Sequence, residues 1–173
     1  IRNAYAIGSV TAGGVNVSVM GRVSVVGGLV GNNVGTVSNT YSTASVSGNG
    51  LFTGGLIGFN GGTVTSSYWD TQTSGQSASA AGTGRTTAQM MQQSTFTGWD
   101  FSVIGDGTIG NWIMAGMPHL QMEHTTTIED AVDLQLMAID LGADYILFND
   151  INASQTRRWN GGLGFDPIGD EIQ

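Results

Sequence analysis

An internal repeat of 27 residues limits what this chain can fold into more than any other feature. Residues 27–41 align with residues 54–68 without a gap, and most differences are conservative. Residues 1–10 match residues 37–46 at an offset of 36, which adds a third, partial copy. A unit this short cannot bury its own apolar face, so neighbouring copies must cover one another. The repeat therefore predicts a fold made by stacking copies.

Within each copy the sequence indicates strands. Short β-branched runs, such as 36–38 and 43–46, are separated by Gly and Asn. Glycines at fixed offsets are expected to supply the positive φ of tight corners. We predict a mainly β protein whose residues 1–70 form a parallel β-helix (β-solenoid), right-handed as its fold class implies, with equivalent residues stacked about 4.8 Å apart. The predicted ladders are Leu29 over Leu56, Val30 over Ile57, Val37 over Val64 and Tyr41 over Tyr68.

Composition excludes several kinds of site. The chain of 173 residues has no Cys, which excludes disulfides, zinc–thiolate centres and iron–sulfur clusters. All five cations are Arg, so P-loop and Schiff-base lysines are excluded too. The net charge of −8 predicts no nucleic-acid partner, because phosphate binding requires clustered cations. No apolar run reaches the roughly 20 residues that span a bilayer, so we predict no membrane insertion.

Charged residues are distributed unevenly along the chain. Residues 1–69 hold two arginines and no acid, whereas ten of the thirteen acids lie between residues 123 and 171. We expect three segments: the repeats over 1–70, a loop and closing cap over 71–122, and an acidic helix–strand segment over 123–173.

The second and third segments carry their own local signals. Polar residues 71–84 predict a surface loop, followed by a short helix from Thr86 or Thr87 through Gln92. Bulky residues around Trp99 and Trp112 are expected to cover the open end of the β-helix. In the acidic segment, Thr127 and Asp130 resemble a capping box, and an apolar face predicts one amphipathic helix ending at Gly142. Residues 145–148 predict a buried strand. The expected apolar face consists of Ala131, Leu134, Ala138 and Leu141.

The repeated Gly-Leu-Val-Gly and Gly-Leu-Ile-Gly elements, at 28–31 and 55–58, are each followed by Gly-Thr-Val and a Tyr. They resemble the GLUG motif of large bacterial surface and secreted proteins, including filamentous-haemagglutinin-like adhesins. Residues 67–70 resemble the end of such an array, residues 86–120 its closing segment, and residues 128–169 the opening of the next array. The resemblance implies a β-helical stalk used in adhesion, with no catalytic residues. The opening-type segment comes last, so the chain is expected to be a cut through a tandem protein.

Candidate site residues follow from the repeat and from isolated motifs. Tyr41, Tyr68 and Trp69, with Tyr5, form an aromatic series that fits either core packing or stacking on sugars. Asp144, Asn149, Asp150 and Asn152 fit either turn chemistry or oxygen ligands for Ca²⁺. No catalytic, cofactor or metal residue is assigned: His119 and His124 lack the spacing of a metal pair, and the Gly-rich run 105–110 predicts a β-turn. The repeat-defining positions are Gly28, Leu29, Gly31, Tyr41, Gly55, Leu56, Gly58 and Tyr68.

These observations favour a non-catalytic structural and adhesive module of a secreted or surface-bound bacterial protein. The expected partners are neighbouring copies or modules of the same protein, and host or matrix glycans. One copy's acidic C-terminal segment is expected to dock near Ile1 of the next, which builds a fibre head to tail. The alternatives are a carbohydrate-binding domain and a polysaccharide-degrading β-helix. A degrading enzyme needs acids in a cleft, and residues 1–69 supply none.

Overall fold

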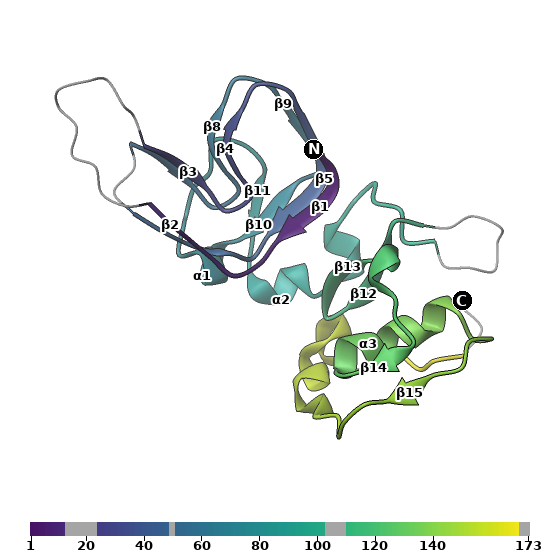
Figure 1. The fold of residues 1–173 in the computed structure, drawn as a ribbon. Coiled ribbons are helices and arrows are strands. Elements are labelled where there is room, and N and C mark those ends of the chain that lie inside the picture. Colours follow the sequence, from purple (N-terminus) through teal and green to yellow (C-terminus); the bar gives the residue numbers. More distant parts are fainter. Residues whose placement is uncertain (13–23, 49–50, 103–109, 170–173) are drawn as a thin grey trace. The chain divides into compact units, whose positions relative to one another are not determined.

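The structure is a computed structural model that describes residues 1–12, 24–48, 51–102 and 110–169 (Figure 1). It is mainly β, with short helices and several small sheets. The chain forms two compact units, residues 1–87 (unit 1) and residues 88–173 (unit 2). Residues 71–87 therefore belong with the repeats, and residues 88–122 belong with the acidic segment, a grouping that differs from the three expected segments.

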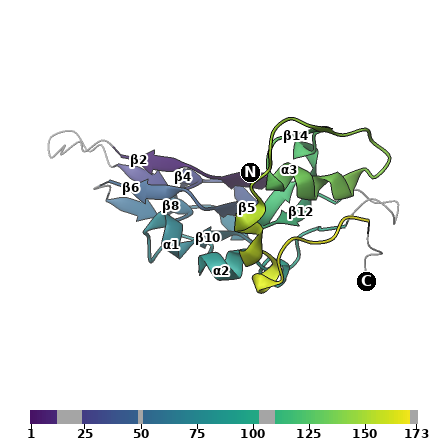
Figure 2. The same cartoon turned by 90° about the horizontal axis from the view of Figure 1, so that it is seen from below.

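Unit 1 consists of short strands joined by tight corners. Figure 2 shows strands from distant parts of the sequence side by side, such as β2 (Ser9–Thr11) beside β6 (Ser45–Ser47). The other strands of this unit are β1 (Arg2–Ala6), β3 (Val25–Gly27), β4 (Val30–Asn33), β5 (Thr36–Ser42), β7 (Phe52–Gly54), β8 (Ile57–Asn60), β9 (Thr63–Thr65), β10 (Tyr68–Asp70) and β11 (Thr83–Arg85).

Strand pairing in unit 1 is parallel and follows the repeat. Strands β3, β4 and β5 pair with β7, β8 and β9 at an offset of 27, and β5 also pairs with β10 at that offset. Strands β1 and β2 pair with β5 and β6 at an offset of 36. The register predicted from the repeat is thus confirmed for the pairs Val30–Ile57, Val37–Val64 and Tyr41–Tyr68.

The core of unit 1 draws on equivalent positions of the two copies. Val37, Leu56, Ile57 and Trp69 form a buried cluster. The Leu29 amide donates to the Leu56 carbonyl at 3.0 Å, which places these two equivalent residues side by side, although Leu29 is only partly buried. The partly buried residues packed against this cluster are Leu29, Val30, Val64 and Ala81.

Residues 71–87 extend the pairing of unit 1. Helix α1 (Thr71–Ser74) follows β10 directly, and β11 then pairs in parallel with β10. Between them, the Ser79 hydroxyl accepts from the Ile57 amide at 2.8 Å, and the Ala80 amide donates to the Ile57 carbonyl. The predicted surface loop is confirmed for residues 75–82, most of which are exposed, whereas helix α1 and strand β11 form its two ends.

Unit 2 mixes short strands with short helices. Helix α2 begins at Thr87, the last residue of unit 1, and ends at Met90, two residues before the predicted end. The remaining elements are η1 (Gln93–Thr95), β12 (Trp112–Ala115), β13 (Met117–Leu120), η2 (Gln121–Glu123), β14 (Thr127–Ile128), α3 (Ala131–Leu136), η3 (Met137–Ile139), β15 (Ile146–Leu147), η4 (Ala153–Arg158) and η5 (Asn160–Gly162). Among the described residues, no helix has both the length and the apolarity needed to cross a membrane.

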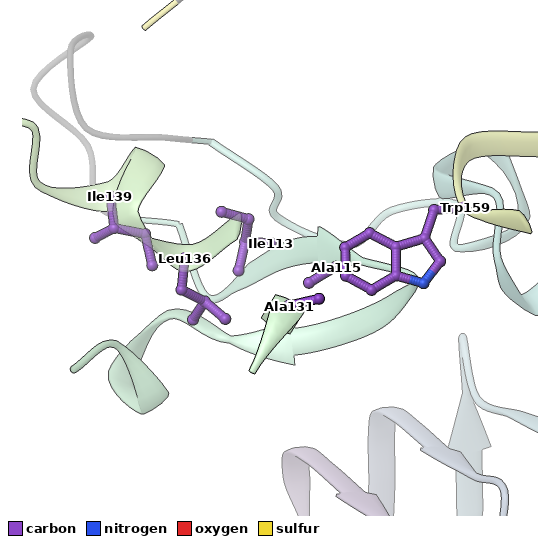
Figure 3. Close-up of a cluster of buried hydrophobic side chains, with 6 residues drawn as sticks. All are labelled: Ile113, Ala115, Ala131, Leu136, Ile139 and Trp159. Atoms are coloured by element: carbon purple, nitrogen blue, oxygen red, sulfur yellow. The ribbon is translucent and has the colours of Figure 1, made fainter. Parts of the chain in front are cut away.

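The core of unit 2 lies between α3 and the antiparallel hairpin β12–β13 (Figure 3). A separate aromatic group consists of Phe96, Trp99 and Trp112. The ring centroid of Trp99 lies 4.4 Å from that of Trp112 and 4.7 Å from that of Phe96. The expected role of the residues around Trp99 and Trp112 in covering the end of a β-helix stays a prediction. The buried core residues are Ile113, Ala115, Ala131, Leu136, Ile139 and Trp159.

Helix α3 is shorter than predicted and begins differently. Its N-cap is Asp130, whose carboxylate accepts from the amides of Val132 and Asp133, so Thr127 is not the cap. The α-helix ends at Leu136 and continues only as the 3₁₀ turn η3. Of the predicted apolar face only Ala131 is buried, since Leu134 and Ala138 are half-buried and Leu141 is 63% exposed. The apolar residues buried in their place are Leu136 and Ile139.

The strand β15 is confirmed as a strand, but its predicted burial is wrong. It pairs in parallel with β14 alone among the described strands, and Ile146, Leu147 and Phe148 are 67%, 62% and 69% exposed. An apolar run alone does not distinguish a buried strand from one at a sheet edge. The β-turn predicted at 105–110 lies outside the described residues except for Gly110.

Candidate functional site

The repeat-defining glycines of unit 1 lie at close contacts between or within the paired copies. A Cβ added at Gly55 would collide with the Trp69 indole, and one added at Gly28 would meet the Gly55 carbonyl. A Cβ at Gly58 would lie 2.7 Å from the Val26 carbonyl oxygen, well inside van der Waals contact. Gly28 and Gly58 are thus required by close approach of the backbone of the other copy, and Gly55 by the position of the Trp69 indole.

Their expected role in supplying positive φ is wrong for these positions. The left-handed corners of the copies fall instead on non-glycine residues at equivalent places: Asn3, Asn39 and Ser66, with φ of 48°, 51° and 43°. Asn tolerates this conformation because its short polar side chain bonds locally. The corner is therefore specified by Asn in two copies, and Ser66 occupies it in the third.

Polar side chains also pair between copies. The Asn33 side-chain amide donates to the Asn60 side-chain carbonyl at 2.7 Å, and Asn33 is 5% exposed. The Thr40 hydroxyl donates to the Ser67 hydroxyl at 3.0 Å, with both residues buried. Buried polar groups are costly unless they are hydrogen-bonded, so each pair favours one register over its neighbours.

The aromatic series is placed in the core rather than on an open face. The Tyr5 and Tyr41 rings stack with centroids 5.0 Å apart and planes 4° from parallel. Tyr41, Tyr68 and Trp69 are 1%, 7% and 6% exposed. The Trp69 Nε1–H donates to the Gln76 carbonyl at 3.1 Å. A sugar needs an exposed ring face, so this burial favours the packing role for these three residues.

The first acid of the chain, Asp70, is fully buried and structural. Its carboxylate accepts from the amides of Gln72 and Thr73 at 2.8 and 3.2 Å, which caps α1. Its other oxygen accepts from the Thr87 hydroxyl at 2.7 Å. With its acceptors engaged in this way, Asp70 has no route to a substrate. An Asp directly before the first residue of a helix is a common N-cap signal, which the sequence prediction missed here.

Both histidines lie in unit 2 and pair with neighbouring side chains. His119 Nδ1 is 2.9 Å from a Glu123 carboxylate oxygen, and His124 Nε2 is 2.7 Å from the Tyr145 hydroxyl. That hydroxyl also donates to the Asp140 carbonyl at 2.6 Å. Burial and, less strongly, the Asp140 carboxylate raise the pKa of the Tyr145 phenol above its ordinary value. The Tyr145 hydroxyl therefore holds the turn before β15 in place through its bonds to His124 and to the Asp140 carbonyl.

The four residues considered for Ca²⁺ are all exposed, and the two asparagines bond within the chain. The Asn149 amide donates to the Glu129 carbonyl at 2.8 Å, and the Asn152 side-chain oxygen accepts from the Ser154 amide at 3.0 Å, which caps η4. In the part of the chain that the structure describes, no three His, Asp or Glu side chains are grouped as metal ligands. Asp144 and Asp150 are not brought into a common site there.

Comparison of the chain with known protein families, with curated proteins and with solved structures found no match.

Proposed function

We propose that this chain is a non-catalytic structural and adhesive module, whose repeats form successive turns of a parallel β-helix in a large secreted or cell-surface bacterial protein. The observation that carries the proposal is the parallel pairing of β3, β4 and β5 with their equivalents one repeat later, at the same offset of 27. A constant offset over successive strands is what stacked turns require.

Side-chain chemistry between the copies supports the same proposal. Hydrogen-bonded ladders of Asn and hydroxyl groups, with glycines that exclude any Cβ, stabilise one spacing and one register. Such a unit supplies rigidity and repeated display. Its expected partners are further copies or modules of the same protein, and matrix or host glycans contacted outside the buried aromatic series.

The proposal is tested by displaying the chain on a non-adherent bacterium and measuring attachment to immobilised matrix proteins and glycans. We expect a gain in attachment over cells that display the Gly55→Ala variant, in which the added methyl group collides with the Trp69 indole and disrupts the core of unit 1. No reducing ends or unsaturated sugars are expected from a panel of acidic polysaccharides. Equal attachment by both strains, or release of sugar products, would contradict the proposal.

A further inference from the structure

Two phenylalanine side chains lie together on the surface of unit 1. Phe52 is the first residue of β7 and is 37% exposed, and Phe59 lies in β8 and is 41% exposed. Their ring centroids are 5.3 Å apart and their planes cross at 67°, which is an edge-to-face contact. Each ring therefore supports the other while part of its surface stays open to solvent. We call Phe52 and Phe59 the phenylalanine pair.

The stacking of the copies does not require either phenylalanine. In the register of the paired strands, Phe52 lies beside Val25 and Phe59 lies beside Asn32, which are the equivalent residues of the preceding copy. The preceding copy thus forms the same paired strands with a smaller apolar residue and a polar one. Two adjoining rings that stacking does not need, and that stay partly exposed, point to a ligand.

The charge of unit 1 favours a neutral ligand. Residues 1–69 hold two arginines and no acid. The strands around the phenylalanine pair, β3, β4, β7 and β8, contain no charged residue at all. Charged ligands are selected by complementary charges, and these strands offer none. A neutral ligand needs no such partner.

The size of the phenylalanine pair favours a small ring over a protein surface. An aromatic side chain buries about 150–250 Å² when it is fully covered, and less than half of each ring is exposed here. The pair therefore supplies far less than the roughly 800 Å² that each partner of a stable protein interface buries. A pyranose ring matches this area, because its weakly positive C–H groups pack against the negative face of an aromatic ring.

An amide group beside the pair adds the polar contact that a sugar needs. Asn32 is exposed and lies next to Phe59 in the paired strands β4 and β8. Residues in register on neighbouring strands face the same side of a sheet. The Asn side chain both donates and accepts hydrogen bonds, so it can bond the hydroxyl groups of a sugar whose C–H face covers the ring.

We propose that the phenylalanine pair and Asn32 form a binding subsite for a neutral glycan. One pyranose ring stacks on the exposed aromatic surface, and its hydroxyl groups bond the Asn32 amide. The subsite rests on the proposed function and deepens it, because it assigns the glycan contact to a surface outside the buried aromatic series. The preceding copy lacks both rings, so the two copies together supply a single subsite.

Isothermal titration calorimetry of the 173-residue chain tests the subsite, with cellohexaose, chitohexaose and xylohexaose as neutral probes. We expect saturable binding of at least one of them at a single site. Because no ion pair is involved, the affinity should change little between low and high salt. The acidic probe hexagalacturonate should bind no more tightly than the neutral ones.

Exchanging residues between the copies provides variants that the fold already accommodates. Phe59→Asn and Phe52→Val introduce the residue types of the preceding copy, and each is expected to weaken binding at least about tenfold. Phe59→Tyr keeps the aromatic face and is expected to retain binding. The matched control is Ile7→Thr, which introduces the residue type of the equivalent Thr43 at an apolar residue 68% exposed elsewhere in unit 1. It is expected to leave the affinity unchanged.

Several results would overturn the subsite. They are no binding of any neutral probe, unchanged affinity in Phe59→Asn and Phe52→Val, an equal loss in Ile7→Thr, or tighter binding of the acidic probe. Circular dichroism during thermal unfolding checks that the variants keep the wild-type fold. Attachment of cells that display the chain to immobilised matrix proteins, without binding of any neutral probe, would contradict the subsite alone and leave the proposed adhesive function standing.

Discussion

The two units stabilise their folds by different means. In unit 1 the strongest contacts join residues 27 or 36 positions apart, and the same positions recur in each copy. In unit 2 the core joins single, unrepeated positions such as Ile113, Leu136 and Trp159, and caps and 3₁₀ turns connect them. Aligning the copies of a repeat therefore predicts its long-range contacts, whereas the long-range contacts of an unrepeated core cannot be predicted in this way.

The largest expected effect lies at the close approach of Gly55 to the Trp69 indole in unit 1. Gly55→Ala places a methyl group against the Trp69 indole and should destabilise unit 1 by about 3 kcal/mol or more, because a tightly packed core cannot take extra atoms. Gly35→Ala is the matched control, since a Cβ there meets nothing within 4 Å. Urea unfolding followed by circular dichroism measures both, and equal losses would contradict the packing described for Gly55.

Two aspartate caps, one in each unit, provide the next comparison. Asp70→Ala removes a buried carboxylate and leaves the Thr87 hydroxyl without its acceptor, so we expect a loss of about 2–3 kcal/mol. Asp130→Ala removes an exposed cap and should cost about 1 kcal/mol. Chemical denaturation of the two variants ranks them. A larger loss at Asp130 would reverse the assignment of Asp70 as a buried structural anchor.

The asparagine ladder should contribute less. Asn33→Ala breaks the bond to Asn60 and should cost about 1.5 kcal/mol, because the half-buried Asn60 side-chain carbonyl loses its donor. Asn32→Ala, one residue earlier and exposed, should be close to neutral. The difference between their urea midpoints is the readout, and no difference would show that the ladder does not stabilise the register.

A substitution that completes the corner series should stabilise unit 1. Ser66→Asn puts at φ 43° the residue type found at the equivalent Asn3 and Asn39, and should gain about 0.5 kcal/mol. Asn39→Ser should produce a loss of similar size. Thermal unfolding measures both, and the same sign for the two changes would contradict the equivalence of these corners.

The smallest effect is a pH dependence confined to unit 2. The raised pKa of Tyr145 means that the folded state holds the phenolic proton more tightly than the unfolded state. Its stabilising contribution is therefore complete below the unfolded value of about 10 and is lost as pH rises through the folded pKa. Ultraviolet titration of tyrosinate should show one late step that Tyr145→Phe removes. If Tyr145→Phe instead removed a tyrosinate step at lower pH, the assignment of the raised pKa to Tyr145 would be contradicted.

The two units differ in how much of their fold could be predicted from the sequence, and the reason is physical. Because the repeat fixes the offset, aligning two copies was enough to predict that Val30 pairs with Ile57 and Tyr41 with Tyr68. The same alignment did not reveal that Gly55 is needed for packing against Trp69, since conformational and steric needs for Gly look alike in a sequence.

Outside the repeat, local patterns were a weaker guide. The helix start near Asp130 was recognisable from its capping residues, but its end and buried face depend on contacts with β12 that no periodicity records. The exposure of Leu147 was missed for the same reason, since an apolar strand is buried only if another element covers it. The bonds of Ser79 and Ala80 to Ile57 were not predicted, because they use backbone and hydroxyl groups instead of apolar side chains.

The in-register stacking of copies is tested most directly by cysteine cross-linking, for which a chain without native cysteines is suited. Thr36 and Thr63 are exposed and directly opposite in β5 and β9, so their Cα atoms are about 4.8 Å apart and within disulfide range. Under mild oxidation we expect Thr36→Cys/Thr63→Cys to cross-link rapidly within one chain. Thr36→Cys/Thr65→Cys, displaced by two residues, should cross-link slowly or not at all. Equal or faster reaction of the displaced pair would contradict the stacking on which the account rests.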